Sequence, residues 1–118
     1  MKYKLTLLGL LFSFFTVAQS KNQTAVIDVD GVCGMCKSRI EKACFQTKGV
    51  KHADWNVETH QLKLIFNNQK TDLDAIKLNI TSVGHDTDNY KATEEAYMSV
   101  DMCCRYRDEK VVQEHNKN

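Results

Sequence analysis

The chain has 118 residues and carries 16 Lys and Arg against 15 Asp and Glu, a formal net charge of +1. This balance argues against nucleic acid as a partner, because binding to phosphates requires a basic surface. After the first twenty residues no apolar run reaches the roughly 20 residues of a membrane span, so we expect a small domain that is not membrane-embedded.

Residues 1–20, "MKYKLTLLGLLFSFFTVAQS", have the plan of a signal peptide. Two lysines precede an uncharged apolar run over 5–18, and Ala18 and Ser20 offer a cleavage site of small residues. We therefore expect export to the periplasm or the extracellular space after cleavage near Ser20. Loss of the two lysines lowers the basic count from 16 to 14 against 15 acids, a net charge near −1.

The first half of the remaining chain predicts a strand, a helix and a hairpin. Apolar and polar residues alternate over 25–30, which is typical of a half-buried strand. Apolar residues then recur at helical spacing over 35–45, and a glycine ends that helix. The alternation returns over 50–57 and 61–66, with a short turn between them.

A second helix is predicted over 71–84, with Thr71 as its cap and Gly84 at its end. Residues 85–92 read as a weak, polar edge strand. The order strand, helix, strand, strand, helix, strand predicts an α+β protein with the ferredoxin-like βαββαβ sandwich. Four antiparallel strands would form its sheet, with both helices on one face. Residues 93–118 form a C-terminal extension with a short helix over 94–98 and a frayed end over 113–118.

Two cysteines three positions apart, Cys33 and Cys36, lie where the strand over 25–30 passes into the helix over 35–45. Unpaired backbone N–H groups and the helix dipole favour an anion there and lower the pKa of a thiol. Soft ions prefer thiolates, and two sulfurs about one helical turn apart can hold Cu(I) or Hg(II), which accept low coordination numbers. The pair predicts a soft-metal site.

Three other interpretations of this pair stay open. A Cys-x-x-Cys pair in an exported chain is also typical of a thiol-disulfide oxidoreductase, although this chain has no proline to supply the cis-proline of thioredoxins. A structural zinc site needs four ligands, and the second pair, Cys103 and Cys104, is adjacent rather than spaced. A structural disulfide is the third. With Cys44 interpreted as a small buried hydrophobe, four thiols remain and allow three pairings.

The loop "GVCGMC", the apolar Ile40 and Cys44, and the Gly-Val pair at 49–50 follow one another at set distances. In this pattern residues 26–90 resemble the heavy-metal-associated domain of copper chaperones, metal-pump amino-terminal domains and periplasmic mercury-binding proteins. The loop is one residue shorter than the usual Gly-Met-x-Cys-x-x-Cys and lacks the methionine that precedes it, so we expect Val32 to replace part of that packing.

The resemblance implies a heavy-metal-associated domain over 21–92 with Cys33 and Cys36 as its primary metal ligands. Cu(I) is the expected ion, with Hg(II), Ag(I) and Zn(II) as alternatives. A membrane metal transporter or another metal-binding domain is the expected partner. His85 follows the second helix, in a loop that lies next to the metal loop in the resembling fold, and is a candidate third ligand.

The C-terminal extension adds sulfur beyond the expected end of the domain. Met102, Cys103 and Cys104 follow one another there and are candidate additional ligands if the tail folds back over the Cys33/Cys36 loop. A disulfide from the tail to the loop is the alternative.

From these observations we expect an exported soft-metal-binding protein, not an enzyme, that sequesters or transfers Cu(I). A scavenger of Hg(II) or another heavy metal is the nearest alternative, and a thiol-disulfide oxidoreductase is the alternative from a different class.

Overall fold

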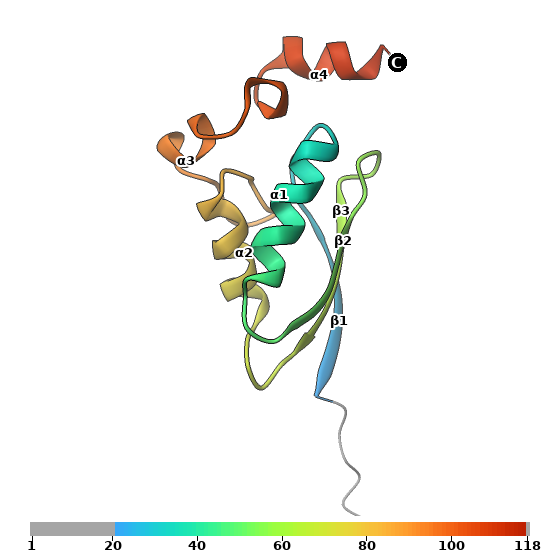
Figure 1. Cartoon of the computed structure of the whole chain (residues 1–118), viewed down its shortest axis with the longest axis vertical. Coiled ribbons are helices and arrows are strands. Elements are labelled where there is room, and N and C mark those ends of the chain that lie inside the picture. Colours follow the sequence, from blue (N-terminus) through green and yellow to red (C-terminus); the bar gives the residue numbers. More distant parts are fainter. Residues whose placement is uncertain (1–20, 118) are drawn as a thin grey trace, which may run out of the picture.

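The computed structural model describes residues 21–117. The predicted signal peptide over 1–20 lies outside the described residues. The elements follow in the order β1 (Asn22–Asp28), α1 (Gly34–Phe45), β2 (Val50–Trp55), β3 (Gln61–Asn67), α2 (Leu73–Ser82), α3 (Glu94–Met98), the short 3₁₀ turn η1 (Met102–Cys104) and α4 (Glu109–Asn116). Figure 1 shows α1 and α2 together on one face of the sheet, with the C-terminal elements at the end where α1 begins.

The sheet has three antiparallel strands in the order β1-β3-β2. The register places Leu64 of β3 opposite Ala25 of β1 and Ala53 of β2. The alternation predicted from the sequence holds: Leu62, Leu64 and Phe66 are buried while their neighbours along β3 are exposed or partly so. Each such side chain contributes about 1.5–3 kcal/mol when fully removed from water, which fixes the inner face of the sheet.

The two helices bury the stripes that their spacing predicted. Ile40 and Cys44 of α1 and Ile76 and Ile80 of α2 are completely buried against the sheet.

The expected cap of α2 was wrong by one residue: Asp72, not Thr71, accepts the hydrogen bond from the backbone N–H of Ala75, at 2.8 Å. Asp ranks above Thr as a cap, which agrees with the choice of Asp72 over its neighbour.

The predicted fourth strand is not part of the sheet of the described residues. Residues 85–92 make one isolated antiparallel bridge, between Thr87 and Val29. The segment then folds on itself, because the backbone N–H of Thr87 donates to the carbonyl of Tyr90 and the carboxylate of Asp86 accepts from the backbone N–H of Ala92. Local side-chain bonds of this kind compete with a strand ladder.

The C-terminal extension is ordered as α3, η1 and α4 and lies over the start of α1 (Figure 1). The short helix expected over 94–98 is present. The frayed end expected over 113–118 is instead helical as far as Asn116, since α4 begins at Glu109 with Asp108 as its cap. Among residues 21–117 no helix has both the length and the apolar character needed to cross a bilayer.

Candidate metal centre

Cys33 occupies the cap position of α1 with extended backbone angles. The first turn of α1 contains no acidic residue, so the free N–H groups and the helix dipole act on this thiol without competition. Burial opposes ionisation of Cys33, but the backbone N–H groups of Cys36 and Met35, together with neighbouring thiols, hold its pKa below the ordinary value. The thiolate that a soft ion requires is therefore favoured at this position.

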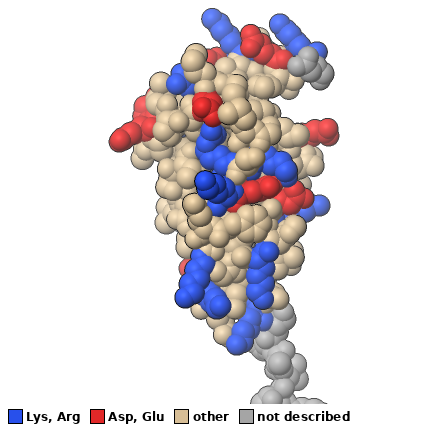
Figure 2. Space-filling view, in the orientation of Figure 1, with Lys and Arg blue, Asp and Glu red and all other residues tan. Residues whose placement is uncertain are grey.

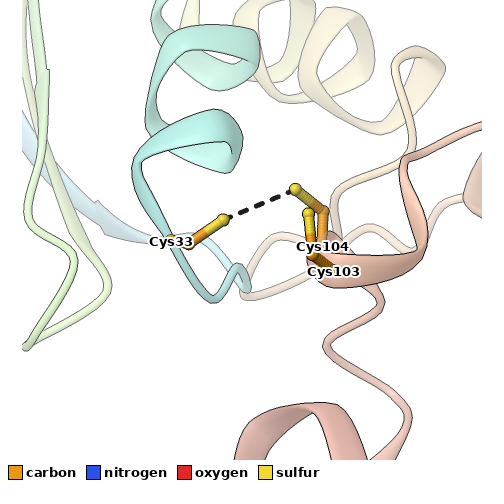
Figure 3. A group of neighbouring side chains, drawn as sticks. All are labelled: Cys33, Cys103 and Cys104. Atoms are coloured by element: carbon orange, nitrogen blue, oxygen red, sulfur yellow. Dashed lines mark hydrogen bonds between the residues drawn. The ribbon is translucent and has the colours of Figure 1, made fainter. Parts of the chain in front are cut away.

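Cys103 and Cys104 of the C-terminal extension lie beside Cys33. The three sulfur atoms all lie within 4.8 Å of one another, and the Sγ atoms of Cys33 and Cys104 are 3.7 Å apart (Figure 3). Cys104 is completely buried whereas Cys103 is exposed. Burial, with the Cys36 thiol acting in the same direction, raises the pKa of Cys104 to about 12, so the Cys104 thiol ionises less readily than that of Cys33.

Cys36, the other member of the predicted pair, lies beneath this group. It is completely buried, and its thiol donates to the backbone carbonyl of Cys104 at 3.9 Å. It also favours the thiolate of Cys33 and disfavours that of Cys104. Cys36 is not among the three cysteines whose sulfurs all lie within 4.8 Å of one another, so it borders the group rather than joining it. The fifth cysteine, Cys44, is buried in the core, where burial raises its pKa to about 12.

The indole of Trp55 supports the loop from below, a role that the sequence pattern did not reveal. Trp55 is fully buried, and its Nε1–H donates to the carbonyl of Val29 at 2.9 Å. A Cβ on Gly31 would lie 2.9 Å from this indole ring, so the glycine permits the loop to rest on it. Val32, the residue expected to replace the missing methionine, is partly buried against the same core.

His85 is not turned toward the thiols. It is completely buried, and its Nδ1 contacts the carbonyl of Asp30 at 2.8 Å while its Nε2 contacts the guanidinium of Arg39 at 3.3 Å. Burial, opposed by the bond to Asp30 and reinforced by Arg39, lowers the pKa of His85 to about 4. The candidate third ligand thus stays neutral and has both ring nitrogens engaged, which suits it to positioning Arg39.

Arg39 links α1 to the tail. Its guanidinium forms an ion pair with Asp101 at 3.0 Å, and against the effect of burial the nearby Cys104 raises the pKa of Arg39, so Arg39 is a positive charge at the edge of the sulfur group. Lys37, the other basic residue near the loop, is paired instead with Glu41 and Asp54, both at 2.7 Å. Figure 2, drawn in the orientation of Figure 1, shows acidic and basic side chains next to one another across the middle of the visible face.

Methionine sulfur reaches the group from α1 rather than from the tail. The side chain of Met102, a candidate ligand, is 72% exposed. Met35 lies instead with its Sδ 3.5 Å from the Sγ of Cys103. The position of Met35 between the two loop cysteines was the only sequence signal for this contact.

The group contains sulfur donors alone, which is the observation that decides which ions fit. Neither a carboxylate nor an imidazole joins the three cysteines in the metal-ligating cluster found among residues 21–117. Such a donor set suits Cu(I), Ag(I) and Hg(II), which prefer thiolates and accept two or three of them. Zn(II) prefers four ligands and would need Cys36 as well.

Comparison with solved structures gives the fold. The structure of the CopZ metallochaperone matches with a TM-score of 0.54 and 32% identity, covering 55% of this chain and 98% of that one. Oxidized MerP from Ralstonia metallidurans CH34 matches with a TM-score of 0.54 and 26% identity, covering 57% of this chain and 94% of that one. These neighbours bear out the ferredoxin-like fold, although β1–β3 are the only strands of the described sheet.

In sequence, the chain also resembles a short part of much longer proteins. A copper-exporting P-type ATPase of Staphylococcus saprophyticus is 36% identical over 75 residues, which are 63% of this chain and 9% of the ATPase. The same enzyme of Staphylococcus aureus strain JH9 is 36% identical over 65 residues. The chain therefore spans less than a tenth of the length of these relatives. No protein-family model matches the chain.

Proposed function

The chain belongs to the heavy-metal-associated domain family, and from this membership we propose that it binds Cu(I) through Cys33 and Cys36 and sequesters or transfers the ion. The observation that carries the proposal is the all-sulfur group of Cys33, Cys103 and Cys104 at the start of α1, with the thiol of Cys36 next to it at the Cys104 carbonyl. The pKa of Cys33 is lowered there by backbone N–H groups, so one ligand is prepared for binding before the ion arrives.

Transfer in this proposal proceeds by thiolate exchange. An incoming pair of thiolates bonds to the ion before the outgoing pair leaves, so no free ion is released. A membrane metal transporter or a second metal-binding domain would supply the incoming thiolates; the similarity to copper-exporting ATPases and to CopZ supports this class of partner. We further propose that the protein is not an enzyme and that it acts outside the cytoplasm, after cleavage near Ser20.

Competition titration tests the metal site. The full-length chain is expressed, purified reduced and without oxygen, and titrated with Cu(I) against a strong chelator, beside a Cys33→Ser/Cys36→Ser variant. We expect tight one-to-one binding whose affinity falls by more than about a hundredfold in the variant, because loss of ligands exceeds the effect of losing an outer-sphere partner. Cys44→Ala is the matched control: it removes a thiol that lies in the core, and its affinity should be unchanged.

Two outcomes contradict the proposal. Equal affinity in the Cys33→Ser/Cys36→Ser variant would place the metal elsewhere. No competitive binding, together with insulin reduction that vanishes in Cys33→Ser, would favour the thiol-disulfide oxidoreductase. A parallel titration with Hg(II) identifies the preferred ion, since the similarity to MerP supports Hg(II) as the second candidate.

A further inference from the structure

We propose that the C-terminal extension is part of the metal site: Cys103 and Cys104 join Cys33 as ligands and close the centre, so that the protein retains its ion until the tail opens. This inference rests on the proposed metal-binding function. It differs from that function in assigning two ligands to a segment outside the strand-and-helix domain and in predicting slow release.

The positions of the three sulfurs suit a three-coordinate ion. With metal–sulfur bonds of about 2.3 Å, the sulfurs of a trigonal site lie about 4.0 Å apart. The Cys33 and Cys104 sulfurs are 3.7 Å apart, and Cys103 completes a triangle with no side above 4.8 Å. These separations are close to those of a trigonal site, and Figure 3 shows Cys33 pointing across to Cys104, with Cys103 beside Cys104.

The turn η1 explains how adjacent cysteines can both take part. The backbone N–H of Cys104 donates to the carbonyl of Asp101 at 2.8 Å, which closes a tight turn over residues 101–104. Cys104 thereby points inward, while Cys103 approaches the group from the solvent side, with its thiol donating to the Sδ of Met35. The α4 residue His115 contacts the carbonyl of Cys103 at 3.2 Å and so reaches the same turn.

Hydrogen bonds of Arg107 and Tyr106 to the segment after α2, together called the anchor, hold the tail over the loop. The guanidinium of Arg107 binds the Asp86 carboxylate at both ends, with distances of 2.8 and 3.2 Å, and donates to the carbonyl of Ala92 at 2.9 Å. The hydroxyl of Tyr106 donates to the carbonyl of Gly84 at 2.7 Å and accepts from the backbone N–H of Asp86 at 3.0 Å. A two-ended Arg–carboxylate pair fixes orientation as well as distance.

Charge at the site agrees with a closed centre. One Cu(I) and three thiolates carry a net charge of −2, which is costly next to a buried cysteine without a positive neighbour. Arg39 supplies that charge, since its guanidinium lies at the edge of the sulfur group and is held in place by Asp101 and His85.

A closed centre predicts how the ion leaves. An incoming dithiol can reach the ion only after a tail cysteine has been displaced. The exposed Cys103 is the ligand that exchanges first. Weakening the anchor should therefore speed release even where every sulfur ligand is kept.

The experiment uses the reduced full-length chain loaded with one Cu(I), together with a Cys103→Ser/Cys104→Ser variant, an Arg107→Ala variant and Lys110→Ala as the control. Lys110 is an exposed basic residue of the same tail. Copper X-ray absorption gives the number of sulfur ligands and the Cu–S distance. Chelator competition gives the affinity, and stopped-flow transfer to a chelator gives the release rate.

We expect three sulfur ligands in the unmodified chain and in the control. In Cys103→Ser/Cys104→Ser we expect two, Cys33 with Cys36 in place of the tail thiols, with a shorter Cu–S distance and an affinity lower by at least about tenfold. In Arg107→Ala we expect release faster by about tenfold. Two sulfur ligands in the unmodified chain, or a double variant with unchanged spectrum and affinity, overturns the closed centre while leaving Cu(I) binding by the loop intact. An unmodified chain that binds no Cu(I) overturns both proposals.

Discussion

The substitution Arg107→Ala measures how much the anchor between the tail and the domain contributes to the free energy of unfolding. The guanidinium makes two charge-assisted hydrogen bonds to Asp86 and one to a backbone carbonyl, and it lies 4.3 Å from the centre of the Tyr97 ring. The Asp86 side chain is only 9% exposed, whereas that of Arg107 is 31% exposed. Removal of the guanidinium therefore leaves a nearly buried carboxylate without its charged partner.

The expected loss lies between that of a surface pair and that of a buried pair. Removing one partner of a fully buried pair costs about 3–5 kcal/mol, and an exposed pair contributes at most about 1 kcal/mol. The contact with Tyr97 adds about 0.5–1 kcal/mol. For a pair with one nearly buried member, we expect Arg107→Ala to lower the free energy of unfolding by about 2–3 kcal/mol.

Urea unfolding of the reduced, metal-free chain, followed by circular dichroism, measures this loss. Asp86→Asn keeps an oxygen for the backbone N–H of Ala92 but removes the charge and replaces one of the two oxygens that Arg107 binds, so the double variant isolates the pair. We expect a coupling of about 1–2 kcal/mol. Coupling below about 0.3 kcal/mol, which is within the error of additivity, would refute the anchor.

The same pair predicts a pH dependence. Burial alone would raise the pKa of Asp86, but hydrogen bonds from Arg107 and from the backbone N–H of Ala92 hold it below the ordinary 3.8. Because the folded pKa is depressed, the stabilisation is present above pH 3.8 and is lost as the pH falls through the folded value. Asp86→Asn should flatten the stability profile in that acidic window; an unaltered slope would contradict the assignment.

Three further predictions concern the loop and the core. Trp55→Phe removes the indole bond to a buried backbone carbonyl and leaves a small void, so urea unfolding should show a loss of about 2–4 kcal/mol, and a loss below about 0.5 kcal/mol would contradict the role of the indole. In the metal-free chain at neutral pH, iodoacetamide should label Cys33 before the more exposed Cys103. The reason is that the pKa of Cys33 is lowered, whereas desolvation and the neighbouring Cys104 thiol raise the pKa of Cys103. Peptide mass spectrometry gives the order of labelling, and the reverse order would contradict the prediction. Gly84→Ala places a Cβ 2.6 Å from the backbone of α3 at a φ of 103°, so thermal unfolding should show a loss of about 1–3 kcal/mol, whereas Gly34→Ala, whose Cβ meets nothing within 4 Å, should lose far less.

Local patterns were enough to predict three strands, both main helices and a favoured thiolate at the start of the first helix. Apolar residues recur every two positions in a half-buried strand and every 3.6 in a helix, because one face of each is removed from water. The alternation in β3 and the apolar stripe of α1 could therefore be predicted without knowing what each packs against. The position of Cys33 at a strand-to-helix junction likewise predicted a stabilised thiolate, because a helix N-terminus presents its N–H groups whatever surrounds it.

Only the tertiary structure decided which side chains meet. Cys33 and Cys104 are 71 positions apart, and they meet because the C-terminal extension folds back over the loop, where Arg107 binds Asp86 of the segment after α2. That segment does not form its predicted strand, because Asp86 accepts hydrogen bonds from the nearby Ala92 backbone and from the distant Arg107, which an edge strand would not provide. His85, a candidate ligand by its place in the chain, was engaged by a carbonyl and a guanidinium instead. Sequence therefore determined which thiols the chain carries and where in the chain they lie, whereas packing between distant segments decided which sulfurs lie side by side.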